Sequence, residues 1–293
     1  MSAPQRDIAL AATLHDPPGA LLGDIARFLP RLQRLYGTVA VATSPPTDDR
    51  VRALLAEHGA DAGSPPSNTR GPLYRLSLRK ALTGDAARVH YLDFDRALHW
   101  MARRPAELAA LLARARRRPA LLIGRTPRAH ASHHEALVVT EAEAGERFAA
   151  RLGLRGRVDF LVPSFVLRRA AVVRLLARSR ARDSTMYGEW VGLLAGLGEP
   201  LTYVECAGLD FETPDSFRAE IRRLGLPAWR SALSTPAEWA MRGALSAEFQ
   251  TGLERALRRF PVRTPVRLSR WSSALRTSAS SDPSRRSSSR SRP

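Results

Sequence analysis

The stretch that decides the fold is Arg88-Val89-His90-Tyr91-Leu92-Asp93-Phe94-Asp95. Its first part is apolar and of strand length, and two acidic residues follow directly. A short, largely apolar run of this kind is typical of a strand buried on both faces of a sheet. The acids then fall at the carboxyl end of a strand, which is where open α/β sheets bind ligands.

Strand-like and helix-like patterns alternate on both sides of this stretch. Strands are expected at 8–13, 38–43, 120–124, 158–162 and 201–205. Helices are expected between them, at 22–35, 48–58, 73–82, 105–118, 168–177 and 183–197. This alternation predicts the α/β class, with a mostly parallel open sheet and helices on both faces.

The sequence after this region predicts a helical C-terminal extension. Thr235-Pro236-Ala237-Glu238 has the pattern of a helix start, with Thr as the cap and Pro in the first turn. The helix is expected to run to about residue 260. From 272 the chain is rich in Ser, Arg and Pro, which predicts disorder. We therefore expect an α/β domain at 1–225, the extension at 226–271 and a disordered tail at 272–293.

Composition indicates a soluble globular protein. Of the 293 residues, 44% are hydrophobic and 25% are charged, and no window approaches the roughly 18 consecutive apolar residues of a membrane span. The polar N-terminus does not resemble a secretory signal. The single cysteine, Cys206, excludes an intramolecular disulfide and a cysteine-based zinc site. A cytoplasmic location is expected.

The net charge of +18 comes almost entirely from arginine, since Lys80 is the only lysine. Residues 262–293 alone hold eight arginines and one aspartate. A basic tail of this kind can contact anionic lipid or nucleic acid weakly without that being the main role of the protein. A protein that mainly binds nucleic acid would lose nearly all binding when this segment is deleted.

Asp93 and Asp95 are candidate metal ligands. Residues i and i+2 of an extended turn point the same way, so both carboxylates can face one site. Hard oxygen ligands suit Mg²⁺ or Mn²⁺, which bridge protein carboxylates and substrate phosphates. The alternative is that Asp93 caps the following helix and Asp95 pairs with Arg96. The first strand lacks a following Gly-x-Gly-x-x-Gly, and the chain has no Walker A loop or Gly-x-Ser-x-Gly elbow, which argues against three other enzyme classes.

Over about residues 7–215, the order of these segments resembles the nucleotide-binding half of GT-A glycosyltransferases, especially the family 2 type. The matching segments are 9–13, 39–43, Asn68-Thr69-Arg70-Gly71 and 89–95. The resemblance implies a GT-A-like fold of the nucleotide-diphospho-sugar transferase type. It also implies a metal-dependent glycosyltransferase with a nucleotide-sugar donor and an unknown acceptor.

The resemblance further implies roles for individual residues. Thr13, His15 and Asp16 would lie near the nucleobase or ribose. Asn68, Gly71, Arg75 and Asp93 would approach the diphosphate or the donor sugar. Asp210 and Glu212, just past the last expected strand, are candidates for a third metal or phosphate contact, and Asp210 would join Asp93 and Asp95 as a metal ligand.

The catalytic base is the point at which the sequence departs from the family pattern. The Glu-Asp pair expected at the start of the late helix is absent, and the nearest acids are Asp183 and Glu189. Asp183 is the first candidate base and Glu189 the second. As structural alternatives, Asp183 could cap a helix, and Trp190 beside Glu189 could be a core residue.

Two other readings of the function stay open. A nucleotidyltransferase on a related fold would release pyrophosphate from a nucleoside triphosphate. A non-catalytic nucleotide-binding module would bind metal without an acid acting as base. The histidines His130, His133 and His134 are expected in a loop, where they either line the acceptor cleft or are solvated.

Overall fold

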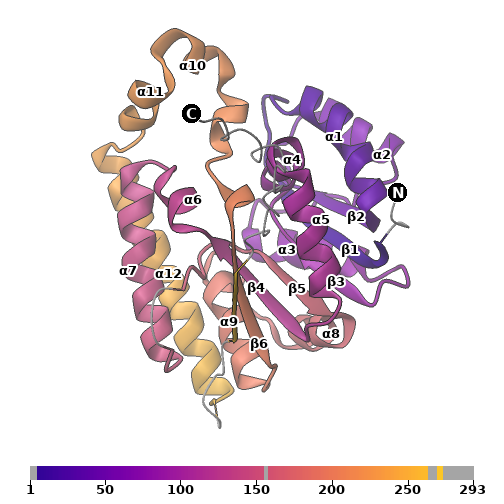
Figure 1. Ribbon diagram of the computed structural model, residues 1–293, viewed down its shortest axis with the longest axis vertical. Helices are drawn as coiled ribbons and strands as arrows, with labels where there is room; N and C mark the ends of the chain where they lie inside the picture. The colour runs from indigo at the N-terminus through magenta and orange to yellow at the C-terminus, as the bar shows by residue number, and fades with distance from the viewer. Residues whose placement is uncertain (1–4, 155–157, 263–268, 273–293) are drawn as a thin grey trace, which may run out of the picture.

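The computed structural model describes residues 5–154, 158–262 and 269–272. Within these ranges the strands form one seven-stranded sheet of order β2-β1-β3-β5-β4-β6-β7, in which β5 alone runs antiparallel to its neighbours (Figure 1). The strands are β1 Gln5–Leu14, β2 Tyr36–Thr43, β3 Arg88–Tyr91, β4 Ala120–Arg125, β5 Phe165–Arg168, β6 Leu201–Cys206 and β7 Ser269–Ser272. Most of the tail that the sequence predicts to be disordered, residues 273–293, lies outside the described residues.

The sheet is buried on both faces because its central strands are largely apolar. In β1, Ala9 and Ala11 join the core on one face, while Ile8 and Leu10 join the core on the other. Successive side chains of a strand point to opposite faces, so an unbroken apolar run serves both cores.

Helices cover both faces (Figure 1). The core around Ile8 and Leu10 is covered by α1 Leu22–Leu35, α2 Asp49–Glu57, α4 Phe94–Arg103 and α5 Pro105–Ala115. The core around Ala9 and Ala11 is covered by α3 Arg70–Ala81, α7 Glu135–Arg151, α8 Arg169–Arg178, α9 Thr185–Gly196 and α12 Pro236–Arg259. Shorter helices are α6 Pro127–Ala131, α10 Arg218–Leu224 and α11 Leu226–Ala232, with 3₁₀ turns at Ala207–Leu209 and Thr213–Ser216. The predicted fold class is confirmed.

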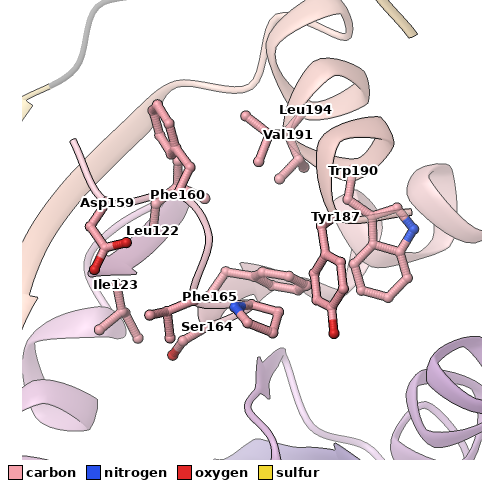
Figure 2. A pocket seen from close by; sticks show the side chains of 12 residues that line it. Leu122, Ile123, Asp159, Phe160, Ser164, Phe165, Tyr187, Trp190, Val191 and Leu194 are labelled. Carbon is pink, nitrogen blue, oxygen red and sulfur yellow. The ribbon is translucent and has the colours of Figure 1, made fainter. Parts of the chain in front are cut away.

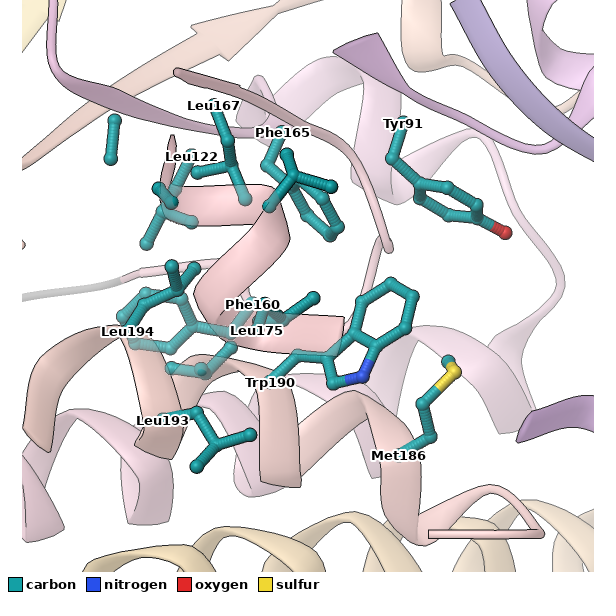
Figure 3. Packing of buried hydrophobic residues seen from close by; sticks show 14 of the residues in the cluster. Tyr91, Leu122, Phe160, Phe165, Leu167, Leu175, Met186, Trp190, Leu193 and Leu194 are labelled. Atoms are coloured by element: carbon teal, nitrogen blue, oxygen red, sulfur yellow. The ribbon is translucent and has the colours of Figure 1, made fainter. Parts of the chain in front are cut away.

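The long helix α12 packs along α9. The hydroxyl of Thr235 accepts the backbone N–H of Glu238, as the helix-start pattern predicts. The two helices approach closely at Gly252, where an added Cβ would lie 1.8 Å from the carbonyl oxygen of Thr185. Trp190 of α9 packs against Phe165 of β5, with the two ring centroids 5.5 Å apart (Figure 3). Trp190 is therefore a core residue.

One expected strand was wrong. Residues 158–162 form no strand, and the chain instead pairs at β5, which begins two residues after Pro163. Proline has no N–H to donate to a ladder and so interrupts strand pairing. The apolar side chains that suggested a strand, Val158, Phe160 and Val162, are buried nonetheless.

The histidine segment is only partly the loop that the sequence predicts. His130 belongs to α6, and His133 and His134 lie between α6 and α7. All three are buried rather than solvated, with at most 6% of the residue exposed. No described helix combines the length and apolarity needed to cross a membrane.

Candidate functional site

A cleft of about 720 Å³ opens at the carboxyl ends of β1, β2 and β3. These strand ends, the start of α3, α9 and α12 all contribute residues to its lining. The predicted site residues that line it are Thr13, His15, Asn68, Asp93, Asp95 and Asp183. The fold thus gathers side chains from distant parts of the sequence into one ligand-sized cleft.

Asp93 is tied into the wall of the cleft through one carboxylate oxygen. Oδ1 accepts hydrogen bonds from the hydroxyls of Thr13 at 3.1 Å, Tyr91 at 3.1 Å and Tyr74 at 3.3 Å. The Tyr74 hydroxyl also bonds to that of Tyr187 in α9. Asp93 precedes α4, but its side chain makes no capping hydrogen bond. Burial raises the pKa of this carboxylate because desolvation disfavours its charged form.

Asp95 belongs to a group of three acids that share one arginine. Arg96 places Nη2 3.1 Å from Oε1 of Glu212 and Nε 3.9 Å from Oδ2 of Asp93. Asp95 Oδ1 accepts the backbone N–H of Arg96 at 2.7 Å. Burial, and then repulsion from Glu212 and Asp93, raises the pKa of Asp95 to about 7. Three carboxylates facing one guanidinium leave a negative surplus that a bound cation would neutralise.

The acids fit a metal that arrives together with phosphates. No group of three or more His, Cys, Asp and Glu side chains in the described ranges is arranged to enclose a metal. Mg²⁺ does not need such a cage, since one or two carboxylates usually hold it together with waters and substrate phosphates. Among the described residues, Asp95 accepts one hydrogen bond, from a backbone N–H, which leaves an oxygen for a ligand. Oε2 of Glu212 is buried without a hydrogen-bond partner in the part of the chain that the structure describes, and Nε2 of His133 lies 3.7 Å from it.

His15 and Asp16 have different roles despite being adjacent. His15 lines the cleft, with Nδ1 2.7 Å from Oγ of Ser44. Asp16 is 4% exposed, and its carboxylate accepts the N–H groups of Ala20 and Leu21, each at 2.9 Å. The structure therefore uses Asp16 to hold the turn before α1, and not in the lining of the cleft.

Gly71 and Arg75 also lie outside the lining of the cleft. The N–H of Gly71 donates to the carbonyl of Arg182 at 3.1 Å, and a Cβ there would lie 2.2 Å from the carbonyl oxygen of Ala181. Arg75 Nη1 donates to the same Ala181 oxygen at 2.6 Å. Both residues brace the segment that carries Asp183 to the cleft.

The two candidate bases are separated by the structure. Asp183 lines the cleft, and its Oδ1 accepts the N–H of Thr185 at 3.0 Å and its hydroxyl at 2.5 Å. The hydroxyl bond lowers the pKa of Asp183. Glu189 is absent from the lining of this cleft, and its carboxylate accepts the N–H of Arg180 at 2.7 Å and the hydroxyl of Ser179 at 2.6 Å. Of the two acids, Asp183 alone faces the cleft.

Asp210 is bound to a histidine instead of joining Asp93 and Asp95. His99 lies with Nε2 3.0 Å from Asp210 and Nδ1 2.6 Å from Asp215. Burial alone would lower the pKa of His99, but these two acids raise it to about 9. The acid from this region that reaches the Asp93 and Asp95 group is Glu212.

The cleft also contains residues that the sequence did not single out for the site. Among them are Arg70, Tyr74, Arg96, Tyr187, Arg242 and Glu248. Arg70, Tyr74 and Arg96 each adjoin a predicted site residue, so proximity in sequence was a usable signal for them. Arg242 and Glu248 come from α12, and only its tertiary packing brings them to the cleft.

A second, apolar pocket lies between the 158–165 segment and α9 (Figure 2). Phe165, Trp190 and Leu194 are among its lining residues. Its volume of about 20 Å³ is close to the minimum of about 10–15 Å³ that holds one water. This pocket is therefore a small packing gap and no substrate site.

Comparisons with known proteins give structural matches alone. No protein-family model matches the chain, and no curated protein sequence matches it. The chain is similar to the crystal structure of glucosyl-3-phosphoglycerate synthase from Mycobacterium tuberculosis in complex with Mn²⁺, UDP and glucosyl-3-phosphoglycerate. The identity is 16% over 88% of this chain and 81% of that chain, with a TM-score of 0.46. A second structure of that enzyme, with Mn²⁺, UDP and phosphoglyceric acid, matches at 18% identity over 88% and 80%, with a TM-score of 0.47.

Proposed function

We propose that the protein transfers a sugar from a nucleotide-diphosphate sugar to an acceptor hydroxyl, with the help of a divalent metal. The observation that carries this proposal is the cleft at the carboxyl ends of β1, β2 and β3, which is lined by Asp93, Asp95 and Asp183 together. Its volume of about 720 Å³ lies within the roughly 300–1,000 Å³ typical of small-molecule sites.

On the donor side, we assign Thr13, His15 and Asn68 to the nucleoside and diphosphate. Asp95 would be the principal metal ligand and Asp93 the second, with Glu212 as the nearby third acid. A bound Mg²⁺ or Mn²⁺ would neutralise charge on the departing diphosphate. Arg96 supplies a fixed positive charge beside the same acids.

On the acceptor side, we assign Asp183 as the residue that takes the proton of the attacking hydroxyl. Its ionised form is favoured by the hydrogen bonds from Thr185, so it is ready to accept a proton at neutral pH. A carboxylate of low pKa is a weak base, and its effect then depends mainly on positioning. Gly71 and Arg75 provide that positioning by holding the preceding segment.

The test is a thermal-shift panel of UDP-, GDP- and ADP-sugars with and without Mn²⁺. We expect stabilisation by one nucleotide class that requires the metal and is lost in Asp95→Asn. The matched control is Asp49→Asn, because Asp49 is an exposed acid on α2 whose side chain pairs with Arg52. Absence of stabilisation by every nucleotide, or equal loss in both variants, would overturn the proposal. Release of the free nucleotide with an added acceptor then measures transfer itself.

A further inference from the structure

A separate cavity of about 240 Å³ lies on the other side of the segment that carries Asp183. It is bounded by this segment, by α9 and by the C-terminal half of α12. Four arginines line it, two from the segment and two from α12: Arg180, Arg182, Arg255 and Arg259. A concave site with this many guanidinium groups has the character of an anion site.

The positive charge of this pocket is only partly compensated. Its two acids are Asp183 and Glu189. Both oxygens of Glu189 are engaged, since Oε1 accepts the N–H of Arg180 and Oε2 accepts the hydroxyl of Ser179. Asp183 Oδ1 is held by Thr185. Neither acid forms an ion pair with a pocket arginine in the described structure.

Two of the arginines are available for a ligand. The side chains of Arg182 and Arg255 make no hydrogen bond or ion pair within the described residues, and both residues are exposed. Arg180 and Arg259 each donate one hydrogen bond to a backbone carbonyl, at 3.3 Å and 3.2 Å. Each guanidinium has five N–H donors, so both keep donors for a ligand.

Arg75 does not line the pocket but adds a positive charge near Arg180 and Arg182. Burial lowers the pKa of Arg75, and the like charges of Arg79, Arg180 and Arg182 lower it further, against the attraction of Glu189. An anion bound between these guanidinium groups would reduce their mutual repulsion. The repulsion and the open donors are independent of the metal-binding acids in the main cleft.

We infer that this arginine pocket binds the phosphate group of a small phosphorylated molecule. Phosphate matches the fork of N–H donors that arginine presents, and two arginines can hold it from opposite sides. The volume of about 240 Å³ is below the roughly 300–1,000 Å³ of most small-molecule sites, which favours a ligand smaller than a nucleotide. Asp183 lines this pocket and the main cleft alike, so the bound phosphate lies next to the residue that we assign as base.

The site can be tested without any assay of sugar transfer. Binding of inorganic phosphate and of glycerol phosphate is measured by calorimetry at constant ionic strength, with EDTA present to exclude metal. The double variant Arg182→Gln/Arg255→Gln removes the two available arginines. The control Arg222→Gln/Arg223→Gln removes the same charge from exposed residues of α10. Asp95→Asn shows whether the metal acids contribute.

We expect the pocket variant to weaken binding of both probes at least fivefold, and the control and Asp95→Asn to bind as the wild type does. Binding of the ester as tightly as inorganic phosphate supports a phosphorylated metabolite as the ligand. Equal weakening in the control, unchanged binding in the pocket variant, or exclusion of the ester would each overturn the inference. None of these outcomes depends on whether the main cleft binds a nucleotide sugar.

Discussion

Thr13 lies near the end of β1 and Asp93 follows the neighbouring parallel strand β3, and the hydroxyl of Thr13 donates to Oδ1 of Asp93 across 3.1 Å. This bond joins a residue assigned to the nucleoside with a residue assigned to the metal. The same oxygen also accepts from Tyr74 and Tyr91, so the carboxylate has little freedom to rotate.

Thr13→Val should weaken nucleotide and metal binding together. Valine keeps the shape of the side chain but removes one donor to Asp93, which is worth about 1 kcal/mol or about fivefold in affinity. Titration of Mn²⁺ in the presence of the stabilising nucleotide measures this change. Thr83→Val serves as control, because the exposed hydroxyl of Thr83 bonds to the carbonyl of Lys80. A normal affinity in Thr13→Val would show that this bond does not orient the carboxylate.

Metal affinity should rise steeply with pH around neutrality. The raised pKa of Asp95, about 7, means that a proton must leave before the carboxylate can bind a cation. Below pH 6 we expect the Mn²⁺ affinity to fall by about tenfold per pH unit, and above pH 8 to level off. Asp95→Asn should bind Mn²⁺ weakly with a flatter pH profile. A wild-type affinity that is constant from pH 5.5 to 8.5 would exclude Asp95 as the ligand.

His99 should make stability fall at alkaline pH. Its pKa is raised to about 9 in the folded chain, against about 6.5 when unfolded. Protonated His99 therefore contributes fully to the free energy of unfolding below pH 6.5. This contribution, at most about 3 kcal/mol, is lost as the pH rises through 9. Urea unfolding at pH 6 and pH 9.5 measures it, and His99→Gln should reduce the difference between the two. An unchanged difference in His99→Gln would assign the pH dependence to other groups.

Gly71→Ala and Gly23→Ala should have opposite effects. The new methyl group at residue 71 would lie 2.2 Å from the backbone oxygen of Ala181, so the segment that leads to Asp183 must move. We expect this to lower the free energy of unfolding by about 1–3 kcal/mol. At Gly23, inside α1, nothing lies within 4 Å of the added Cβ, and alanine should stabilise by up to about 1 kcal/mol. Thermal unfolding compares both. Nucleotide-dependent stabilisation should persist in Gly71→Ala, because Asp93 and Asp95 follow β3 and not α3, while transfer should fall at least tenfold.

Much of the fold could be predicted because its local signals agree with its packing. The apolar run of β1 and the capping pattern at Thr235 each specify one structure, and both predictions are confirmed. The elements missed include β5, α7 and β7. β5 was missed because buried apolar residues before Pro163 resemble a strand in sequence. Their burial comes from a loop that packs against α9, which local periodicity cannot reveal.

The candidate site was less predictable because it depends on where side chains point after each strand. The sequence offered Asp210 and Glu212 with little to separate them, and the turns after β6 place Asp210 on His99 and Glu212 on Arg96. Likewise Asp183 and Glu189 lie close together in the sequence, but the carboxylate of Glu189 is occupied by hydrogen bonds from Ser179 and Arg180.

The position of α12 along α9 has a consequence for how the protein is made. Arg242 and Glu248 of the cleft belong to α12, which is made after every other described helix. Phe249 and Leu253 of the same helix belong to the core that also contains Ala9 and Ala11 of β1. Domains generally fold as units. The core and the cleft are therefore completed together, and only after the last helix has left the ribosome.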